Sequence, residues 1–151
     1  MFGPAVGILD RAHDLTVEAM GLQGRTGETT FAARDPMVMA LVEDATALIE
    51  LAGAQTKLHP VSGAALVEGD PVPTARASFE ALMLSWKTAQ TLNEFWSGVA
   101  SAARETVEVA QQVSPHIVAA CTRKTTPRTP AFVVPALKGG RRNPHRLRLS
   151  S

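Results

Sequence analysis

Two pairs of basic residues near the C-terminus carry the pattern in this chain that most suggests chemistry. Arg123 and Lys124 stand in the run Thr122-Arg123-Lys124-Thr125, and His145-Arg146 forms a second pair. A guanidinium is a planar fork that pairs with carboxylate or phosphate, a lysine is a mobile point charge, and a neutral histidine donates to a carboxylate. Together these groups suit a phosphorylated or polycarboxylate ligand. The competing interpretation is a solvated loop, because a basic tetrapeptide taken alone is a weak signal.

The distribution of charge also favours an anionic ligand. The formal net charge of the 151 residues is +1, yet the first 120 residues hold 7 Lys or Arg against 14 Asp or Glu. Residues 121–151 hold 8 Lys or Arg and no acidic residue. A basic segment of this kind suits phosphates, carboxylate ligands or nucleic acid, with a solvated tail as the alternative.

Other site chemistries have little support in the sequence. His13, His59 and His116 show no metal-ligand spacing with one another or with Cys121, so no zinc site is expected. Neither a Walker-type phosphate loop nor a supported Ser-His-Asp set is present. A single cysteine excludes an internal disulfide framework, and no apolar run reaches the roughly 20 residues that span a bilayer. Because residues 1–14 also lack the pattern of a signal peptide, we expect a cytoplasmic protein.

The helices and strands that must position these groups are predicted from the spacing of apolar residues and from the glycine and proline residues that mark turns. In the first part of the chain we expect a short helix within residues 3–21 and β-structure at residues 29–31. Asp35-Pro36 is a helix-start signal, and apolar residues recurring at three and four predict a helix over residues 37–51 that Gly53 closes. Short antiparallel strands are predicted at residues 56–59, 64–67 and 72–75.

The second part of the chain changes period at Ser78. Apolar residues at steps of three and four predict one long helix, or two in sequence, over residues 78–110, with Ser97-Gly98 as the joint and Trp86 and Trp96 as core anchors. The apolar run at residues 116–121 predicts a parallel strand buried on both faces, followed by a weak helix at residues 129–138 and a strand at residues 145–149. Since ligands collect at the carboxyl ends of parallel strands, Arg123 and Lys124 are well placed for a site.

Short motifs are spread along nearly the whole chain. They are His13-Asp14-Leu15-Thr16, Phe31-Ala32-Ala33-Arg34, Gly69-Asp70-Pro71, Trp86-Lys87, Ser97-Gly98-Val99-Ala100, residues 121–127, Gly139-Gly140 and His145-Arg146-Leu147. Together these motifs resemble the quinolinate phosphoribosyltransferase family, also called carboxylating nicotinate-nucleotide pyrophosphorylases, and most closely its ModD branch, which is associated with molybdenum transport.

The resemblance implies an α/β fold: an N-terminal α+β sandwich domain, here residues 1–114, followed by an α/β barrel whose first strand, helix and strand are residues 115–151. It implies transfer of a phosphoribosyl group from phosphoribosyl pyrophosphate (PRPP) to a pyridine dicarboxylate or related acid, with release of pyrophosphate and carbon dioxide. It also implies magnesium, although the family's acidic magnesium residues have no counterpart in these 151 residues.

The family pattern further implies roles for six residues of this chain. Arg123, His145 and Arg146 would hold the carboxylates, and Lys124 would lie near the ribosyl donor as the catalytic residue. Lys87 would take the place of an arginine inserted from the neighbouring subunit, so a homodimer with a shared site is expected. The remaining member of the substrate-binding set is Thr122.

Two expectations concern how complete the site is. A barrel of eight βα units takes about 250 residues, so we expect an incomplete copy with little activity alone. Pro135 falls inside the predicted helix at residues 129–138, where proline costs roughly 3 kcal/mol or more, so no normal helix is expected there. The alternative function is a non-catalytic dimerising module whose basic tail binds anions or nucleic acid, although nucleic acid is the less expected partner.

Overall fold

The computed structural model describes residues 15–118, 120–121, 129–140 and 143–144 of the chain. Helices and strands are mixed, in agreement with the predicted α+β character of the N-terminal part. The elements are α2 (Leu15–Ala19), β1 (Thr26–Ala32), β2 (Met37–Val38), α3 (Val42–Leu51), β3 (Gln55–Leu58), β4 (Ala65–Leu66), β5 (Pro71–Ser78), α4 (Phe79–Val113), β6 (Ala120–Cys121), α5 (Pro130–Gly139) and β7 (Asn143–Pro144).

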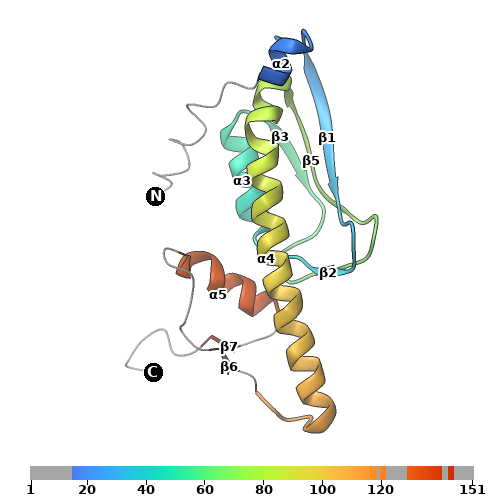
Figure 1. Cartoon of the computed structure of the whole chain (residues 1–151), viewed down its shortest axis with the longest axis vertical. Helices are drawn as coiled ribbons and strands as arrows, with labels where there is room; N and C mark the ends of the chain where they lie inside the picture. The colour runs from blue at the N-terminus through green and yellow to red at the C-terminus, as the bar shows by residue number, and fades with distance from the viewer. Residues whose placement is uncertain (1–14, 119, 122–128, 141–142, 145–151) are drawn as a thin grey trace.

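A three-stranded antiparallel sheet in the order β1-β5-β3 forms one layer, and α3 and α4 lie beside each other against it (Figure 1). The strands predicted at residues 56–59, 64–67 and 72–75 correspond to β3, β4 and β5, and residues 29–31 lie in β1. Antiparallel pairing is confirmed for β3 with β5, while β4 pairs antiparallel with β2 in a separate two-stranded sheet.

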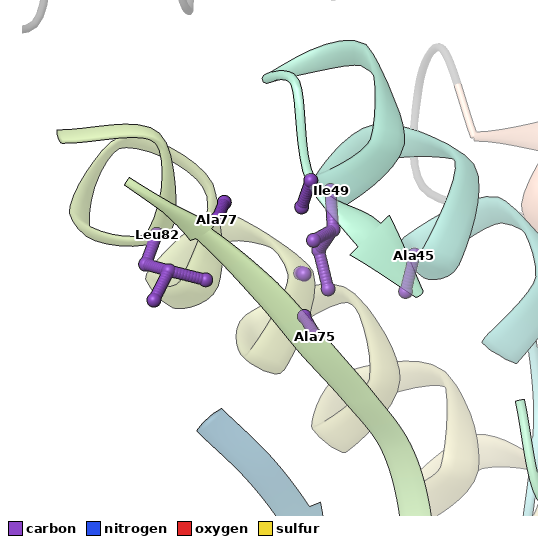
Figure 2. Packing of buried hydrophobic residues seen from close by; sticks show 7 residues of the cluster. Ala45, Ile49, Ala75, Ala77 and Leu82 are labelled. Carbon is purple, nitrogen blue, oxygen red and sulfur yellow. The ribbon is translucent and has the colours of Figure 1, made fainter. Parts of the chain in front are cut away.

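The core between the sheet and the two helices is built from small strand residues and larger helix residues. Ala75 and Ala77 of β5 alternate with exposed positions, so both methyl groups face the helices. Around them lie Ala45 and Ile49 of α3 and Leu82 of α4, as Figure 2 shows. Alanines on the strand let both helices approach closely, and the two branched side chains fill the remaining space.

The helix predicted over residues 37–51 is confirmed from Val42 onward and wrong before it. α3 begins at Val42, immediately after Leu41 adopts a left-handed φ of 56°, and it ends where Gly53 takes a φ of 99°. The segment before Leu41 is extended instead, with β2 at its start.

Long-range hydrogen bonds explain this extended segment. The Val38 N–H donates to Ser101 Oγ (2.8 Å) and the Ala40 N–H donates to Ser97 Oγ (3.0 Å). Both acceptors lie on α4, 63 and 57 residues away in sequence. Because the intervening Met39 N–H donates the opposite way, to the carbonyl of residue 64, successive amides are satisfied on two sides. The helix-start signal at Asp35-Pro36 is therefore overridden by hydrogen bonds between this segment and α4.

Helix α4 runs for 35 residues without a break, so the predicted joint at Ser97-Gly98 is wrong. Ser97 is buried and its carbonyl accepts from Ser101 Oγ (2.7 Å), whereas a Cβ built on Gly98 would meet no atom within 4 Å. The glycine penalty of about 1 kcal/mol is offset by the packing of the buried stripe on either side. Despite this length, no described helix is apolar enough over a sufficient span to cross a membrane.

Helix α5 lies against α4 through a close backbone approach (Figure 1). A Cβ on Gly140 would lie 2.5 Å from the Ala100 carbonyl oxygen, and a Cβ on Gly139 would lie 3.5 Å from the Cα of Gly63. Arg104 of α4 completes this contact, because its Nη2 donates to the carbonyls of Gly63 (3.1 Å) and Gly139 (2.9 Å). The glycine pair therefore joins three separate parts of the chain.

The expectation that Pro135 would prevent a normal helix is wrong, because α5 contains it. Proline lacks the N–H that would reach the carbonyl of Ala131, one turn earlier. Both residues are exposed, so this lost bond falls on the solvent side of α5. On the other side Phe132 and Ala136 pack into a core cluster with α4, which stabilises the helix.

Strand β6 pairs in parallel with β7, so the parallel character predicted for the run at residues 116–121 is confirmed at Ala120–Cys121. β7 lies just before the strand predicted at residues 145–149, and that range falls outside the described residues. Residues 116–118 are not part of a strand, so the described part of the predicted strand is shorter and less buried than expected. Ile117 is 43% exposed and Val118 is 69% exposed. A parallel strand is buried on both faces only where helices and neighbouring strands cover it, and among the described residues β6 has a single partner strand.

The close approach at Gly140 generates the first prediction. Gly140→Ala should lower the free energy of unfolding by about 1–3 kcal/mol, because the added methyl overlaps the Ala100 carbonyl. Urea denaturation of the chain measures this value. The matched control is Gly98→Ala, which adds a methyl in open space within a helix and should raise the free energy of unfolding by up to about 1 kcal/mol. Equal shifts for the two variants would contradict the packing role.

The Glu43 carboxylate, in the first turn of α3, joins that helix to residue 62. It accepts hydrogen bonds from Ser62 Oγ (2.5 Å) and from the Ser62 N–H (2.8 Å). Burial opposes the charged carboxylate, but these bonds and the N–H of Glu43 itself outweigh it, so the pKa of Glu43 lies below its ordinary value of 4.5.

A lowered pKa in the folded state means that this carboxylate stabilises the fold above its unfolded pKa and loses that contribution as the pH falls through the folded pKa. We expect Glu43→Gln to lower stability at neutral pH and to flatten the loss of stability below about pH 4.5. Urea midpoints measured across pH test this. The exposed Glu105→Gln on α4 is the control; an identical pH profile for both variants would show that the Ser62 bonds contribute nothing.

Candidate functional site

Helix α4 carries Lys87, the one member of the predicted site that lies within the described residues. Two hydrogen bonds hold the start of this helix in place. Ser78 Oγ accepts from the Ala81 N–H (3.3 Å), and the Glu80 carboxylate accepts from the Gly24 N–H (2.7 Å). The Gly24 bond is the main reason that the pKa of Glu80 lies below its ordinary value. The segment that carries Lys87 is therefore anchored to the chain preceding β1.

The Lys87 ammonium lies on the exposed surface of α4 but is not unrestrained. Its Nζ is 5.1 Å from the centroid of the Trp86 ring and donates to Gln90 Oε1 at 3.4 Å. Gln90 Nε2 in turn donates to Glu94 Oε1 (2.7 Å). An exposed cation–π contact contributes about 0.5–1 kcal/mol. Because an ammonium has three donors and the described residues engage one, an anionic ligand can take the others.

Lys87 lies at the edge of an apolar depression between α3 and α4, which we call the α3–α4 groove. Its volume is about 620 Å³. Asp44 and Lys87 are its charged residues, and Phe95, 58% exposed, and Leu51, 50% exposed, lie on its apolar wall. The other lining residues are Ala47, Leu48, Thr88, Thr91, Leu92, Trp96, Thr129 and Phe132.

The two tryptophans behave differently from each other. The prediction of a core anchor is confirmed for Trp96, which is 5% exposed and makes an edge-to-face contact with Phe95 at 5.0 Å between ring centroids. It is wrong for Trp86, which is 36% exposed. Ser85 and Ala89 take the buried positions of that turn, so the helix directs residue 86 away from the α3 side.

Trp86 instead lines a second depression, between α4 and the strands β1 and β2, which we call the sheet-side groove. Its volume is about 270 Å³. Three polar residues of α4 border it: Gln90, Asn93 and Glu94. The remaining lining residues are Thr29, Thr30, Phe31, Ala32, Ala33, Met37, Met39 and Val72.

The other predicted site residues, Thr122, Arg123, Lys124, His145 and Arg146, lie outside the described residues. The structure does define the strand ends that precede them in sequence. Cys121, the last residue of β6, is the register partner of Pro144, the last residue of β7, and the two strands are parallel. The two basic segments thus follow strand ends that lie side by side.

The part of the chain that the structure describes contains no group of three or more His, Cys, Asp or Glu side chains able to hold a metal ion. His59 Nε2 lies 3.2 Å from Thr74 Oγ1 on the exposed sheet surface, and His116 is exposed beyond the end of α4. His13 lies outside the described residues.

The sequence interpretation missed two polar residues of α4. Asn93 is 7% exposed, and its Oδ1 is a buried acceptor without a hydrogen bond in the described structure. Arg104 ties α4 to Gly63 and Gly139. The signal for Asn93 was weak, because the buried stripe of α4 also contains the polar residues Ser85 and Ser97. Arg104 gave none, since its partners are backbone carbonyls far away in sequence.

Comparison with known proteins gives consistent relatives. The model of the family described as quinolinate phosphoribosyl transferase, N-terminal domain, matches residues 14–97. A protein of Rhodobacter capsulatus named as the pyrophosphorylase ModD is 40% identical over 139 residues, which are 92% of this chain and 54% of that protein. A protein of Archaeoglobus fulgidus named as a carboxylating nicotinate-nucleotide pyrophosphorylase is 30% identical over 82% of this chain and 48% of its own length. The chain thus spans about half the length of the curated relatives it matches.

Solved structures agree at the level of the fold. NadC from Streptococcus pyogenes has a TM-score of 0.84 at 23% identity, covering 97% of this chain and 54% of that chain. The nicotinate-nucleotide pyrophosphorylase from Francisella tularensis has a TM-score of 0.83 at 16% identity, covering 97% and 52%. The arrangement of elements is therefore shared along nearly the whole chain.

Proposed function

Because this chain belongs to the quinolinate phosphoribosyl transferase family, we propose that it forms part of a site that transfers a phosphoribosyl group from PRPP to a pyridine dicarboxylate or related acid. In this reaction the bond between C1 of the ribose and the pyrophosphate oxygen breaks, a bond from the ring nitrogen to C1 forms, and pyrophosphate leaves. The bond between the adjacent ring carbon and its carboxylate then breaks, carbon dioxide leaves, and that ring carbon takes up a proton. The ModD relative at 40% identity supports a ModD-like member of the family.

The observation that carries the proposal is the setting of Lys87. A cation on a rigid helix, restrained by Trp86 and Gln90 yet with donors to spare, is suited to holding one negative group of a substrate. It stands at the edge of the α3–α4 groove, whose apolar wall suits a flat ring. Lysine binds as a point charge rather than as a bidentate fork, which suits a single carboxylate or phosphate oxygen.

One cation is insufficient for substrates that together carry two carboxylates and several phosphates. In the proposal Thr122, Arg123, His145 and Arg146 contact the acid, and Lys124 stabilises charge at the ribosyl donor. The parallel pairing of β6 with β7 supports this grouping, because Cys121 and Pro144 bring the starts of both basic segments to one edge.

We also propose that the site is shared between two subunits. The exposed positions of Lys87, Leu51 and Phe95 on one side of the domain support an arrangement in which this face meets a second subunit. Lys87 would then reach the substrate of the neighbour, while residues 122–124 and 145–146 of that neighbour supply the other cations.

Magnesium remains part of the proposal as the ion that accompanies the pyrophosphate group of PRPP. When bound, such an ion neutralises phosphate charge and favours departure of pyrophosphate. The described residues contain no cluster of acidic or histidine ligands that fits it, so no step is assigned to it through this chain.

The alternative proposal is a non-catalytic dimerising module whose basic segment binds anions. The excess of 8 basic residues over no acidic ones from residue 121 onward supports it. Titration of the chain with PRPP plus magnesium, with quinolinate and with a DNA oligonucleotide, together with an assay of pyrophosphate release, separates the two proposals. Salt-dependent binding of every polyanion without turnover would favour the module.

Lys87→Ala is expected to leave the fold unchanged and to weaken substrate binding roughly 10- to 150-fold, the loss of a charge-assisted hydrogen bond worth about 1.5–3 kcal/mol. The chain is assayed by isothermal titration with quinolinate and PRPP in the presence of the barrel half of the Rhodobacter capsulatus ModD protein. Lys87→Arg should retain binding. The matched control Lys57→Ala removes an exposed cation from β3; equal affinities for Lys87→Ala and Lys57→Ala would remove Lys87 from the site.

A further inference from the structure

The α3–α4 groove is larger and more apolar than an acid with a single ring requires. Its volume of about 620 Å³ lies in the middle of the range for drug-sized ligands. Leu51 and Phe95 on its wall are exposed. The Thr91 hydroxyl adds little polarity, because it is engaged by the carbonyl of Lys87 (2.9 Å) on its own helix. A ligand that fills this groove therefore needs an apolar body that covers the wall.

The relative direction of the two helices orders the residues along the groove. Leu41, immediately before α3, belongs to the same core cluster as Trp96 of α4. Ile49, near the end of α3, belongs instead to the cluster of Leu82. Helix α3 thus runs antiparallel to α4, and its last turn lies beside the first turns of α4.

The two charged residues of the groove consequently lie toward opposite ends. Asp44 is in the first turn of α3 and Leu51 is the last residue of that helix. Seven positions separate them, which is about 10 Å along the helix axis. Lys87 is the ninth residue of α4 and lies toward the Leu51 end. An elongated ligand in the groove therefore meets a cation at one end and a carboxylate at the other.

These two charges limit the ligand to a single negative group. The Lys87 ammonium rests on Trp86 and Gln90 at the rim, and its exposed, flexible stem lets it turn toward the α3 side with two donors to spare. The Asp44 side chain makes no hydrogen bond or ion pair with the described residues, so its uncompensated charge repels a second anionic group. One carboxylate at the Lys87 end satisfies both conditions.

We propose that the α3–α4 groove binds an apolar monocarboxylic acid with a body of about two fused rings, its carboxylate on Lys87 and its uncharged end toward Asp44. The inference rests on the proposed function for the role of this acid as substrate, and it deepens that function by naming the class of acid. The preferred acid has one carboxylate and an apolar extension, in contrast to a small dicarboxylate.

Four acids and amides test the proposal by isothermal titration of the full chain: 2-naphthoate, 2-naphthamide, naphthalene-2,6-dicarboxylate and quinolinate. We expect 2-naphthoate to bind saturably and about tenfold more tightly than each of the others. The amide lacks the charge for Lys87, the naphthalene dicarboxylate brings a second charge to Asp44, and quinolinate lacks the apolar body. The NMR signal of the Trp96 indole N–H should shift with 2-naphthoate, because Trp96 lines the groove.

Two variants separate the roles of the charges from a general effect on folding. Lys87→Met removes the charge and should lower the affinity for 2-naphthoate to that for 2-naphthamide, while binding of the amide stays unchanged. Asp44→Asn should raise the affinity for naphthalene-2,6-dicarboxylate about fivefold and leave 2-naphthoate binding nearly unchanged, a gain that a structural defect does not produce. The matched control Lys57→Met removes an exposed cation from β3 and should alter neither affinity.

Three outcomes would overturn the proposal. They are no saturable binding of 2-naphthoate at millimolar concentration, equal affinities for 2-naphthoate and 2-naphthamide, and continued discrimination against the naphthalene dicarboxylate in Asp44→Asn. The first outcome, together with a dimer of the chain that Phe95→Asp dissociates, would assign the apolar wall to a second copy.

Failure of this proposal is distinguishable from failure of the proposed function. Pyrophosphate release from PRPP with quinolinate, in the presence of the ModD barrel half, but without naphthoate binding would overturn the groove ligand alone. Naphthoate binding without any phosphoribosyl transfer under the same conditions would overturn the transfer reaction and support the groove as a site for apolar acids.

Discussion

The fold depends on the demand that every buried backbone amide find a partner, and α4 meets that demand for a segment nearly sixty residues earlier in the chain. Ser97 and Ser101 accept the N–H groups of Ala40 and Val38, so the chain between β1 and α3 stays extended and lies along the helix. Serine performs this role because its side chain is short enough for close backbone approach. The same stripe of small residues continues to Ala100 and Ala103, against which Gly140 packs. The N-terminal layers and α5 are thus held by one helix face.

Much of this architecture was readable from sequence wherever local periodicity and tertiary packing agree. The strands at residues 56–75 and the stripe of α4 were of this kind, and so was the parallel character of the strand at Ala120–Cys121. The failures have a common cause, which is a partner distant in sequence. Asp35-Pro36 signals a helix that the α4 serines prevent. Ser97-Gly98 suggests a joint that packing abolishes, and Pro135 is accommodated because its missing bond faces solvent. Lys87 came from the family resemblance, whereas Asn93 required the three-dimensional structure, since burial and lack of a partner are not properties of a sequence pattern.

Helix α4 also borders two separate grooves over residues 86–94. Lys87 borders the groove on the α3 side, whereas Trp86, Gln90, Asn93 and Glu94 border the groove on the strand side. The Lys87 ammonium is linked to this second set through Trp86 and Gln90. The family relationship accounts for the shared fold, and this chain spans about half the length of the relatives.

The unbroken length of α4 has a mechanical consequence. At 1.5 Å per residue its 35 residues extend about 52 Å. The C-terminal end of the helix projects past the sheet (Figure 1), and Val109 and Val113 near this end are exposed. A helix that is not bent at a glycine or a proline is rigid, so its two ends cannot reorient independently. A partner that binds the exposed end at Val113 would therefore act on the same rigid helix that carries Lys87 and that Arg104 joins to Gly63 and Gly139.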